Sequence, residues 1–330
     1  MSPARRGAPR GGIDLGGTKI QAVIVDESGD VIGDARHPTP TTGGPEDVCA
    51  ELADTLADAA AAAGVDPAKL KGVGVGSPGA IDAEAGTVAQ ARNLPDWIDA
   101  FPLADRLSEA VGTPVRVDND VSVATAAEFE LGVGAEYSSL LGVFWGTGVG
   151  GGIVLDGQLW EGRGAAGEIG HVVVKSDGRR CPCGRIGCME AYAGRGAMEV
   201  RAREKVDEGE KTVLFEIMEE KGKPRLSSGI WARALERDDK LAHQLVDRAV
   251  DAIGVALASS LNLLDVEAVV IGGGLGLRLG EPYVEKIRTA IMPHLFADHR
   301  PPEVLLASLG DLGGAIGATL LAAGKAPAHA

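Results

Sequence analysis

The chain has 330 residues, which corresponds to about two domains of ordinary size. Its 32 Lys and Arg residues against 47 Asp and Glu residues give a formal net charge of −15, so neither a nucleic acid nor an anionic membrane is an expected partner. The 48 glycines are roughly twice the ordinary share and predict tight turns or close backbone approaches.

The first part of the chain alternates predicted strands with predicted helices. Three apolar runs, separated by a glycine turn and an Asp/Gly turn, predict a strand meander. An Ala-rich helix follows, and two further strands each lead into a helix. This alternation predicts an α/β fold. The expected strands are 12–15, 20–25, 31–35, 71–76 and 115–117, and the expected helices are 45–63, 101–111 and 122–129.

A second series of the same kind begins near Leu140. A strand, a glycine and threonine turn, a second strand and an Asp-Gly turn repeat the order between Asp14 and Gly29, which we interpret as an internal duplication. A charged, largely helical segment, a long helix, a buried strand and a closing helix follow. The expected elements are strands 140–145, 151–155 and 266–271, the helical segment 194–239, and helices 240–264 and 313–321.

The cysteines and the start of the chain bear on its compartment. Four cysteines are too few for a disulfide framework, and three of them fall within eight residues, as expected for a metal site in a reducing compartment. No apolar segment follows the basic opening residues, so no secretory signal is expected. No apolar stretch reaches the length that spans a bilayer. We therefore expect a soluble cytoplasmic protein.

Two glycine-rich turns are candidate phosphate sites, because glycines let backbone N–H groups approach an anion closely, and a third glycine run is a candidate adenosine site. Asp14 before the first turn is placed to orient a hydrated Mg²⁺. The third turn follows a buried strand, where an adenine or ribose could pack. The alternative for the first two turns is that they are plain hairpin turns without a ligand. The turns are Gly16-Gly17-Thr18-Lys19, Gly146-Thr147-Gly148 and Gly272-Gly273-Gly274.

The second turn also matches the dinucleotide fingerprint over residues 146–151. That fingerprint requires a helix directly after the glycines, whereas Gly152 to Leu155 is typical of a strand. We therefore do not expect NAD to bind there.

One histidine and three cysteines form a candidate metal site. An imidazole and three thiolates make a closed tetrahedral set for Zn²⁺, and no open position is evident, so the expected role is structural. Inert or redox-active thiols and an iron–sulfur site are the alternatives. The ligands are His171, Cys181, Cys183 and Cys188.

Two glutamates flank these ligands. Glu168 precedes His171, and Glu190 follows Cys188, so folding around the ion is expected to bring both carboxylates to one edge of the imidazole. Charged acceptors bind neighbouring hydroxyl groups of a polyhydroxylated substrate strongly and directionally. The alternative is that both are solvated surface residues.

A candidate general base lies where a predicted strand meets a predicted helix, at Asp118-Asn119-Asp120. A carboxylate there is placed to accept a proton from a substrate hydroxyl. The alternative is that one of these residues caps the helix.

Taken together, these motifs resemble the ROK family of sugar kinases and repressors, most closely its bacterial ATP-dependent glucokinases. The resemblance runs from about residue 11 to residue 321, and the cysteine segment is its most specific part. It rests on Asp14-Leu-Gly-Gly-Thr-Lys19, Gly76-Ser-Pro-Gly79, Asn119-Asp120, Gly146-Thr-Gly148, Glu168-Ile-Gly-His171 and Cys181-Pro-Cys-Gly-Arg-Ile-Gly-Cys-Met-Glu190.

The resemblance implies an α/β actin-like ATPase fold, with two RNase H-like lobes around a cleft and a final helix that returns to the first lobe. Residues 11–120 together with 313–325 are expected to form the smaller lobe, and residues 121–312 the larger lobe with the zinc site. Homodimers are usual in such enzymes, so a homodimer, or a homotetramer, is expected.

The resemblance also implies roles for individual residues. Asp120 corresponds to the catalytic base. The sugar-binding positions are Gly79, Asn93, Asn119, Asp120, Glu168, His171 and Glu190, and His171 is also a zinc ligand. The ATP-binding positions are Asp14, Gly16, Gly17, Thr18, Lys19, Gly146, Thr147, Gly148, Gly273 and Gly274.

The implied reaction transfers the γ-phosphoryl group of MgATP to the primary hydroxyl of a hexose, with glucose as the first candidate and N-acetylglucosamine, mannose or fructose as alternatives. About a dozen residues precede Asp14, too few for the winged helix-turn-helix of the family's repressors, so an enzyme is expected. Polyphosphate-using relatives typically lack the cysteine cluster, which favours ATP here. A sugar-responsive regulator without catalysis and an NAD-dependent enzyme are the competing hypotheses.

Overall fold

The computed structural model describes residues 8–323 and divides into two compact units. The first unit comprises residues up to Gly132 and those from Asp311 onward, and the second comprises Val133–Gly310. The basic opening segment, 1–7, and the final residues, 324–330, lie outside the described part. The boundary expected from the sequence, between residues 120 and 121, falls within helix α3 (Asp120–Leu131), which packs against the closing helix within the first unit.

The first unit is built on a five-stranded sheet in the order β3-β2-β1-β4-β7. Strand β2 pairs antiparallel with β1 and β3, whereas β1, β4 and β7 are parallel. The strands are β1 (Arg10–Leu15), β2 (Lys19–Val25), β3 (Val31–Pro38), β4 (Val73–Ser77) and β7 (Val115–Asn119), with a separate hairpin of β5 (Ala80–Asp82) and β6 (Thr87–Ala89); the helices are α1 (Pro45–Ala63), α2 (Leu103–Val111), α3 and α11 (Gly313–Ala322).

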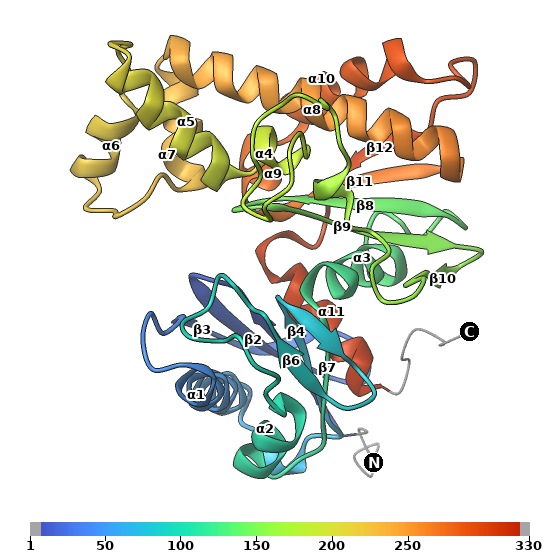
Figure 1. Cartoon of the computed structure of the whole chain (residues 1–330). Coiled ribbons are helices and arrows are strands. Elements are labelled where there is room, and N and C mark those ends of the chain that lie inside the picture. The colour runs from blue at the N-terminus through green and yellow to red at the C-terminus, as the bar shows by residue number, and fades with distance from the viewer. Residues whose placement is uncertain (1–7, 324–330) are drawn as a thin grey trace. The chain divides into compact units, whose positions relative to one another are not determined.

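Helices cover both faces of this sheet, as Figure 1 shows. Neighbouring residues of a strand face opposite sides, and here a Cβ on Gly11 would lie 3.0 Å from Leu56 of α1, whereas one on Gly12 would lie 2.0 Å from the Ala315 carbonyl oxygen of α11. Position 12 therefore requires glycine, because any side chain there would push α11 away from the sheet.

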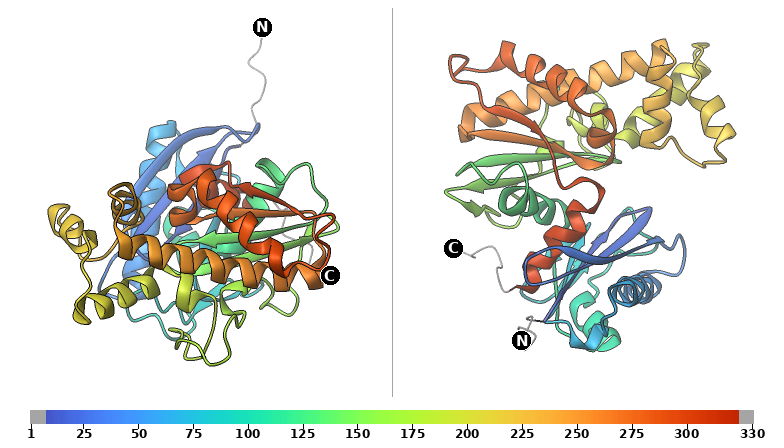
Figure 2. Two further views of the ribbon diagram at one scale, coloured as in Figure 1. Left: turned by 90° about the horizontal axis from the view of Figure 1, so that it is seen from above. Right: turned by 180° about the vertical axis from the view of Figure 1, so that it is seen from behind.

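The second unit carries a sheet in the order β10-β9-β8-β11-β12. The long helix α8 packs beside α10, as Figures 1 and 2 show. A Cβ on Gly254 of α8 would lie 2.6 Å from the Cβ of Ala290 in α10. The strands are β8 (Leu140–Trp145), β9 (Val149–Leu155), β10 (Gln158–Leu159), β11 (Ala268–Gly272) and β12 (Glu303–Leu306); the helices are α4 (Glu190–Ala193), α5 (Arg195–Asp207), α6 (Leu214–Glu220), α7 (Ser228–Glu236), α8 (Lys240–Leu264), α9 (Gly273–Leu279) and α10 (Glu281–Ile291). The 3-10 turns of the chain are Pro67–Lys69, Ile169–His171, Met292–His294 and Gly310–Leu312.

The two sheets have the same strand order and the same pattern of pairing. In the first sheet, β1 is central, pairs antiparallel with β2 and parallel with β4, and β3 and β7 are the edge strands. In the second sheet, β8 is central, pairs antiparallel with β9 and parallel with β11, and β10 and β12 are the edge strands. The internal duplication predicted from the repeated glycine turns is therefore present at the level of the sheets.

Most predicted elements are confirmed, and three have the predicted bounds: α1, β8 and α8. Helix α2 begins at Leu103 rather than 101, because Phe101 instead forms a bridge with Val88. The charged segment 194–239 forms α5, α6 and α7. Strand β9 follows the second glycine turn directly, so the helix that a dinucleotide fingerprint requires does not follow these glycines.

Among residues 8–323, no helix is both long and apolar enough to cross a membrane.

Candidate functional site

The first glycine turn connects β1 to β2 and is held by several short contacts. The Gly16 N–H donates to the Lys19 carbonyl at 2.9 Å, and the Thr39 hydroxyl donates to the Gly16 carbonyl at 2.6 Å. A Cβ on Gly17 would lie 3.0 Å from the side-chain nitrogen of Asn93, so this predicted sugar-site residue lies against the turn. The turn backbone is thereby fixed before any ligand arrives.

Asp14, at the end of β1, faces the start of α11. A Cβ on Gly314 would lie 2.8 Å from the Asp14 carboxyl carbon. Burial raises the pKa of Asp14, Lys19 opposes that rise and Asp311 adds to it. The Lys19 ammonium pairs with Asp311 at 2.8 Å, and Asp311 also pairs with Arg36. A desolvated carboxylate of this kind is stabilised by an added cation.

The carboxyl ends of the three parallel strands bring further predicted residues beside Asp14. Gly76 on β4 pairs with Asp14 on β1 and with Asp118 on β7. A Cβ on Gly76 would lie 3.3 Å from the Cα of Asp120. Strand register therefore places Asp14 on β1 and Asp120, directly after β7, at the same edge of one sheet, on either side of β4.

Asn119, and not Asp120, caps helix α3. Its side-chain oxygen accepts from the N–H groups of Val121 at 3.0 Å and Ser122 at 3.1 Å. Asp120 is the first residue of the helix and accepts from the Val121 N–H at 2.9 Å. The capping alternative thus applies to Asn119, whose amide nitrogen is not part of the cap, and leaves the general-base hypothesis for Asp120 open.

Gly79 lies at the start of the segment between β4 and α2 that contains Asn93. It has φ +109°, and a Cβ there would lie 2.6 Å from the Ala89 carbonyl oxygen. The hairpin of β5 and β6 therefore closes directly on Gly79, and the segment after it returns to the first glycine turn at Gly17.

The second glycine turn connects β8 to β9, as the first connects β1 to β2, but the hydrogen bond that closes it spans one residue fewer. The Gly146 N–H donates to the Gly148 carbonyl at 2.9 Å. A carboxylate oxygen of Glu190 accepts from the Val149 N–H at 2.9 Å and would lie 2.3 Å from a Cβ on Gly148. Glu190 thus braces this turn.

The third glycine run, Gly272-Gly273-Gly274, lies beside the second turn, Gly146-Thr147-Gly148. A Cβ on Gly146 would lie 3.9 Å from the Gly274 backbone nitrogen, and one on Gly273 would lie 2.6 Å from the Trp145 nitrogen. The predicted phosphate turn at 146–148 and the predicted adenosine side at Gly273 and Gly274 are therefore neighbours in the second unit.

Sequence reasoning missed two residues at this turn, Arg195 and Ser228. The Arg195 guanidinium donates to the Thr147 hydroxyl at 2.8 Å and to the Ser228 hydroxyl at 3.0 Å. The chain gives no local signal for these contacts, because 48 residues separate Arg195 from Thr147.

The predicted metal ligands form a compact group. The ligand atoms of His171, Cys181, Cys183 and Cys188 all lie within 4.8 Å of one another. Cys183 Sγ is 3.8 Å from Cys188 Sγ, and Cys181 Sγ is 3.9 Å from His171 Nδ1. In a tetrahedral site with metal–sulfur bonds of about 2.3 Å, two ligand atoms lie about 3.8 Å apart. The donor set and the distances between its ligand atoms therefore fit Zn²⁺.

The chain around these ligands is bent to wrap a small volume. Gly187 has φ +84°, and a Cβ there would lie 1.8 Å from the Lys175 carbonyl oxygen, so glycine is required. Burial raises the pKa of Cys181. Burial would also raise the pKa of Cys183, but hydrogen bonds from Arg185 and the neighbouring thiols outweigh it and lower that pKa to about 7.

The two flanking glutamates lie on different sides of His171. Nδ1 of the ring faces the thiols, whereas Nε2 is 3.7 Å from a carboxylate oxygen of Glu168, whose side chain is 63 % exposed. Glu190 lies on the thiol side, with Oε1 3.7 Å from Cys181 Sγ. Glu168 therefore meets the free edge of the imidazole, and Glu190 bridges the cysteine cluster and the second glycine turn.

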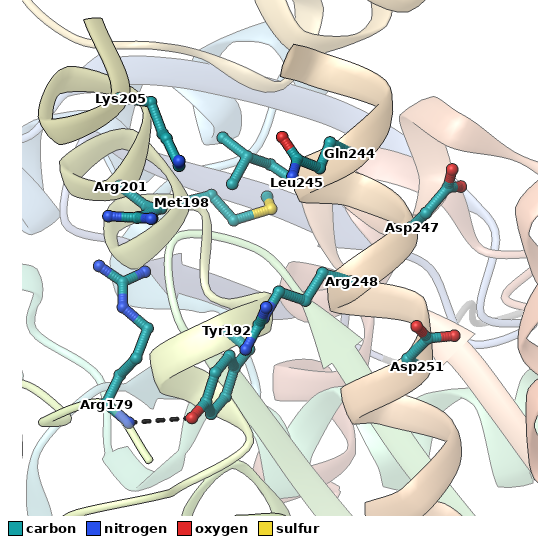
Figure 3. Close-up of a pocket in the computed structure, with 10 residues that line it drawn as sticks. All are labelled: Arg179, Tyr192, Met198, Arg201, Lys205, Gln244, Leu245, Asp247, Arg248 and Asp251. Atoms are coloured by element: carbon teal, nitrogen blue, oxygen red, sulfur yellow. Dashed lines mark hydrogen bonds between the residues drawn. The ribbon is translucent and has the colours of Figure 1, made fainter. Parts of the chain in front are cut away.

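A cavity of about 670 Å³ lies elsewhere in the second unit, between α4, α5 and α8 (Figure 3). Arg179 pairs with Glu204 at 2.9 Å, Lys205 with Glu208 at 2.9 Å, and Arg248 lies over the Tyr192 ring. Its cations are thus largely balanced by nearby carboxylates. No predicted site residue lines it; the lining residues are Arg179, Tyr192, Met198, Arg201, Lys205, Gln244, Leu245, Asp247, Arg248 and Asp251.

Comparison with known proteins agrees with these features. The model of the ROK family matches residues 10–325. A glucokinase of Thermotoga maritima is 34 % identical over 93 % of this chain and 95 % of its own length. An N-acetyl-D-glucosamine kinase of Pectobacterium atrosepticum is 32 % identical over 94 % of this chain and 97 % of its own length.

Solved structures support the same relationship. A ROK family glucokinase from Streptomyces griseus, in complex with glucose and AMPPNP, has a TM-score of 0.83 at 32 % identity and covers 96 % of this chain and 100 % of its own. The predicted α/β class and actin-like ATPase fold are thereby confirmed. The chain belongs to the ROK family.

Proposed function

We propose that this protein is an ATP-dependent glucokinase, which transfers the γ-phosphoryl group of ATP to the primary hydroxyl of glucose and forms glucose 6-phosphate. The observation that carries the proposal is the 34 % identity to a glucokinase over nearly the whole chain, together with a carboxylate, Asp120, at the same sheet edge as a fixed glycine turn. Phosphoryl transfer depends mainly on positioning and charge stabilisation, which such turns provide.

Asp120 is the general base of the proposed reaction. It accepts the proton of the attacking hydroxyl as the oxygen–phosphorus bond forms. Asn119 directs its amide nitrogen to the sugar, because its oxygen is engaged in the helix cap. The remaining hydroxyl groups are assigned to acceptors and donors at Gly79, Asn93, Glu168, His171 and Glu190. Nε2 of His171 beside Glu168 supports this assignment, since charged acceptors select adjacent hydroxyls.

The donor nucleotide is assigned to the glycine turns. Gly16, Gly17, Thr18 and Lys19 of the first turn and Gly146, Thr147 and Gly148 of the second contact the phosphates, and Gly273 and Gly274 contact the adenosine. The buried carboxylate of Asp14 suits it to holding hydrated Mg²⁺. When bound, Mg²⁺ would neutralise charge on the phosphate oxygens.

Zn²⁺ is proposed as a structural ion bound by His171, Cys181, Cys183 and Cys188. The spacing of the ligand atoms and the all-sulfur-and-nitrogen donor set support zinc over Mg²⁺ or Ca²⁺, which prefer oxygen. When bound, Zn²⁺ would hold His171 at Nδ1, which faces the thiols, and would leave Nε2 free for the sugar.

The wider context follows from these assignments. We propose a cytoplasmic enzyme of carbohydrate metabolism that works in glycolysis as a homodimer. The N-acetyl-D-glucosamine kinase relative, at 32 % identity, makes an amino sugar the second candidate substrate.

One kinetic experiment tests the proposal. Purified protein with Mg²⁺ and ATP is assayed by coupled ADP release against glucose, N-acetylglucosamine, mannose and fructose. The largest kcat/KM is expected for glucose. A larger value for N-acetylglucosamine would reassign the substrate, and the absence of turnover with every sugar, with sugar binding retained, would indicate a regulator.

A further inference from the structure

The first residues of helix α5 are hydrogen bonded to the second glycine turn. The Arg195 N–H donates to the Gly146 carbonyl at 3.1 Å, and the Gly196 N–H donates to the Thr147 carbonyl at 3.0 Å. The first N–H groups of a helix have no partner within it, so they are available for such bonds. The turn and the start of α5 therefore form one unit.

The Arg195 side chain makes a second set of contacts. It donates to Thr147 Oγ1 at 2.8 Å and to Ser228 Oγ at 3.0 Å. A guanidinium group only donates, whereas a hydroxyl oxygen accepts and its single hydrogen donates elsewhere. The Thr147 hydrogen must therefore point away from Arg195.

Arg195 is half-buried, and within residues 8–323 no carboxylate forms an ion pair with it. Burial lowers the pKa of Arg195, Arg225 lowers it further and Glu199 opposes both, but the guanidinium remains protonated at any physiological pH. Glu199 is itself engaged, with Arg203 at 2.8 Å and with the Leu226 N–H at 3.0 Å. The positive charge beside the turn is thus available to an anion.

We propose that Arg195 is a positioning residue for the phosphate chain of the donor nucleotide. It holds the Thr147 hydroxyl with its hydrogen directed at a phosphate oxygen and adds positive charge to the turn. This inference rests on the proposed function, which assigns the donor phosphates to this turn. Because Arg195 acts on the donor side, its loss changes the affinity for ATP and leaves that for glucose unchanged.

The test combines three single variants and one double variant. Arg195→Met removes the donors and keeps much of the apolar stem, Arg195→Lys keeps the charge, and Thr147→Val removes the hydroxyl. The double variant joins Arg195→Met with Thr147→Val. For each, kcat and the KM values for ATP and glucose are measured, together with the Kd for AMPPNP by calorimetry and the thermal unfolding midpoint.

In Arg195→Met, the KM for ATP and the Kd for AMPPNP are expected to rise about tenfold to a hundredfold, the loss typical of a charge-assisted hydrogen bond. The KM for glucose stays within about twofold. Arg195→Lys recovers part of the loss, and the double variant loses little more than the worse single variant, because both act on one contact. Arg201→Met, on the same helix, is the matched control and leaves all three constants unchanged.

An unchanged KM for ATP in Arg195→Met, equal rises in both KM values, or additive losses in the double variant would overturn the inference. If Arg195→Met unfolds near the assay temperature, the KM values for ATP and for glucose are compared in Arg195→Lys and Thr147→Val instead. A wild-type protein that binds AMPPNP without phosphorylating any sugar would refute the proposed function alone, since the AMPPNP affinities still decide the role of Arg195.

Discussion

The two five-stranded sheets share one strand order, but the glycine turns of their first hairpins are held by different chemistry. The first turn contacts the neutral side chains of Asn93 and Thr39, and its Lys19 is paired with Asp311. The second turn is held by the charged side chain of Arg195, which has no ion-pair partner in the described residues, and by Glu190.

This difference shows how two sheets of the same strand order can carry glycine turns with different roles. The sheet fixes the backbone of both turns, whereas the segments inserted between strands set their charge. The first turn lies beside the buried carboxylate of Asp14, which suits a cation, and the second lies beside the Arg195 guanidinium, which forms no ion pair within residues 8–323 and suits an anion. Substitutions in the two units should therefore have different kinds of effect.

The largest effect is expected from Asp120→Asn in the first unit. Loss of the general base should lower kcat about 10² to 10⁴-fold, and the affinities for glucose and AMPPNP should stay near wild type. The Asn119 cap of α3 is retained, so the unfolding midpoint should change little. Asp99→Asn, at an exposed position, is the control in the same assays. Turnover close to wild type would remove Asp120 from the base role.

A metal effect is expected in the second unit alone. Cys188→Ser should lose about one zinc per chain by elemental analysis and lower the unfolding midpoint by roughly 5–10 °C, because the binding free energy of a structural metal contributes directly to folding. Cys49→Ala, a buried cysteine of the first unit, should keep the metal. Equal metal content in Cys188→Ser and wild type would contradict the zinc assignment.

Close packing of α11 predicts a stability effect in the first unit. Gly12→Ala should lower the free energy of unfolding by about 2 kcal/mol, because its methyl group would overlap the Ala315 carbonyl at 2.0 Å. Gly72→Ala is the matched control, since its nearest neighbour atoms are 3.5 Å away. Denaturant unfolding measures both, and an equal effect of the two substitutions would show that α11 tolerates the displacement.

The smallest effect concerns the edge strand β3, where His37 bonds Glu51 at 2.6 Å and Asp58 at 2.9 Å. The bond to Glu51 raises the pKa of His37, burial opposes the rise, and Asp58 adds to it. A raised pKa contributes stability that is complete below the ordinary value of about 6.5 and is lost as pH rises through the folded value.

His37→Gln should therefore be less stable than wild type near pH 5.5, by under about 1 kcal/mol, and the difference should shrink toward pH 9. Denaturant unfolding at the two pH values measures it, with His294→Gln as the control. If the difference in free energy of unfolding between His37→Gln and wild type grew with pH, it would contradict a raised pKa of His37.

The sequence predicted the local elements well and the tertiary contacts only in part. Helix α1, strand β8 and helix α8 have the predicted bounds, because their apolar spacing and flanking Gly, Pro and Asp residues act within a few residues. The metal ligands were also predictable, since three of them lie within eight residues. The role of Asn119 as the helix cap, by contrast, was one of three alternatives that spacing could not separate.

The sequence by itself determined the α/β class, the repeated glycine turns and the donor set of the metal cluster, all of which depend on residue types at short spacing. Only the tertiary structure decided that Asn93 lies against Gly17, that α11 begins beside Asp14, and that Arg195 bonds Thr147. These contacts join residues far apart in the chain. Their formation depends on strand register and on how closely helices pack against a sheet, which no local pattern encodes.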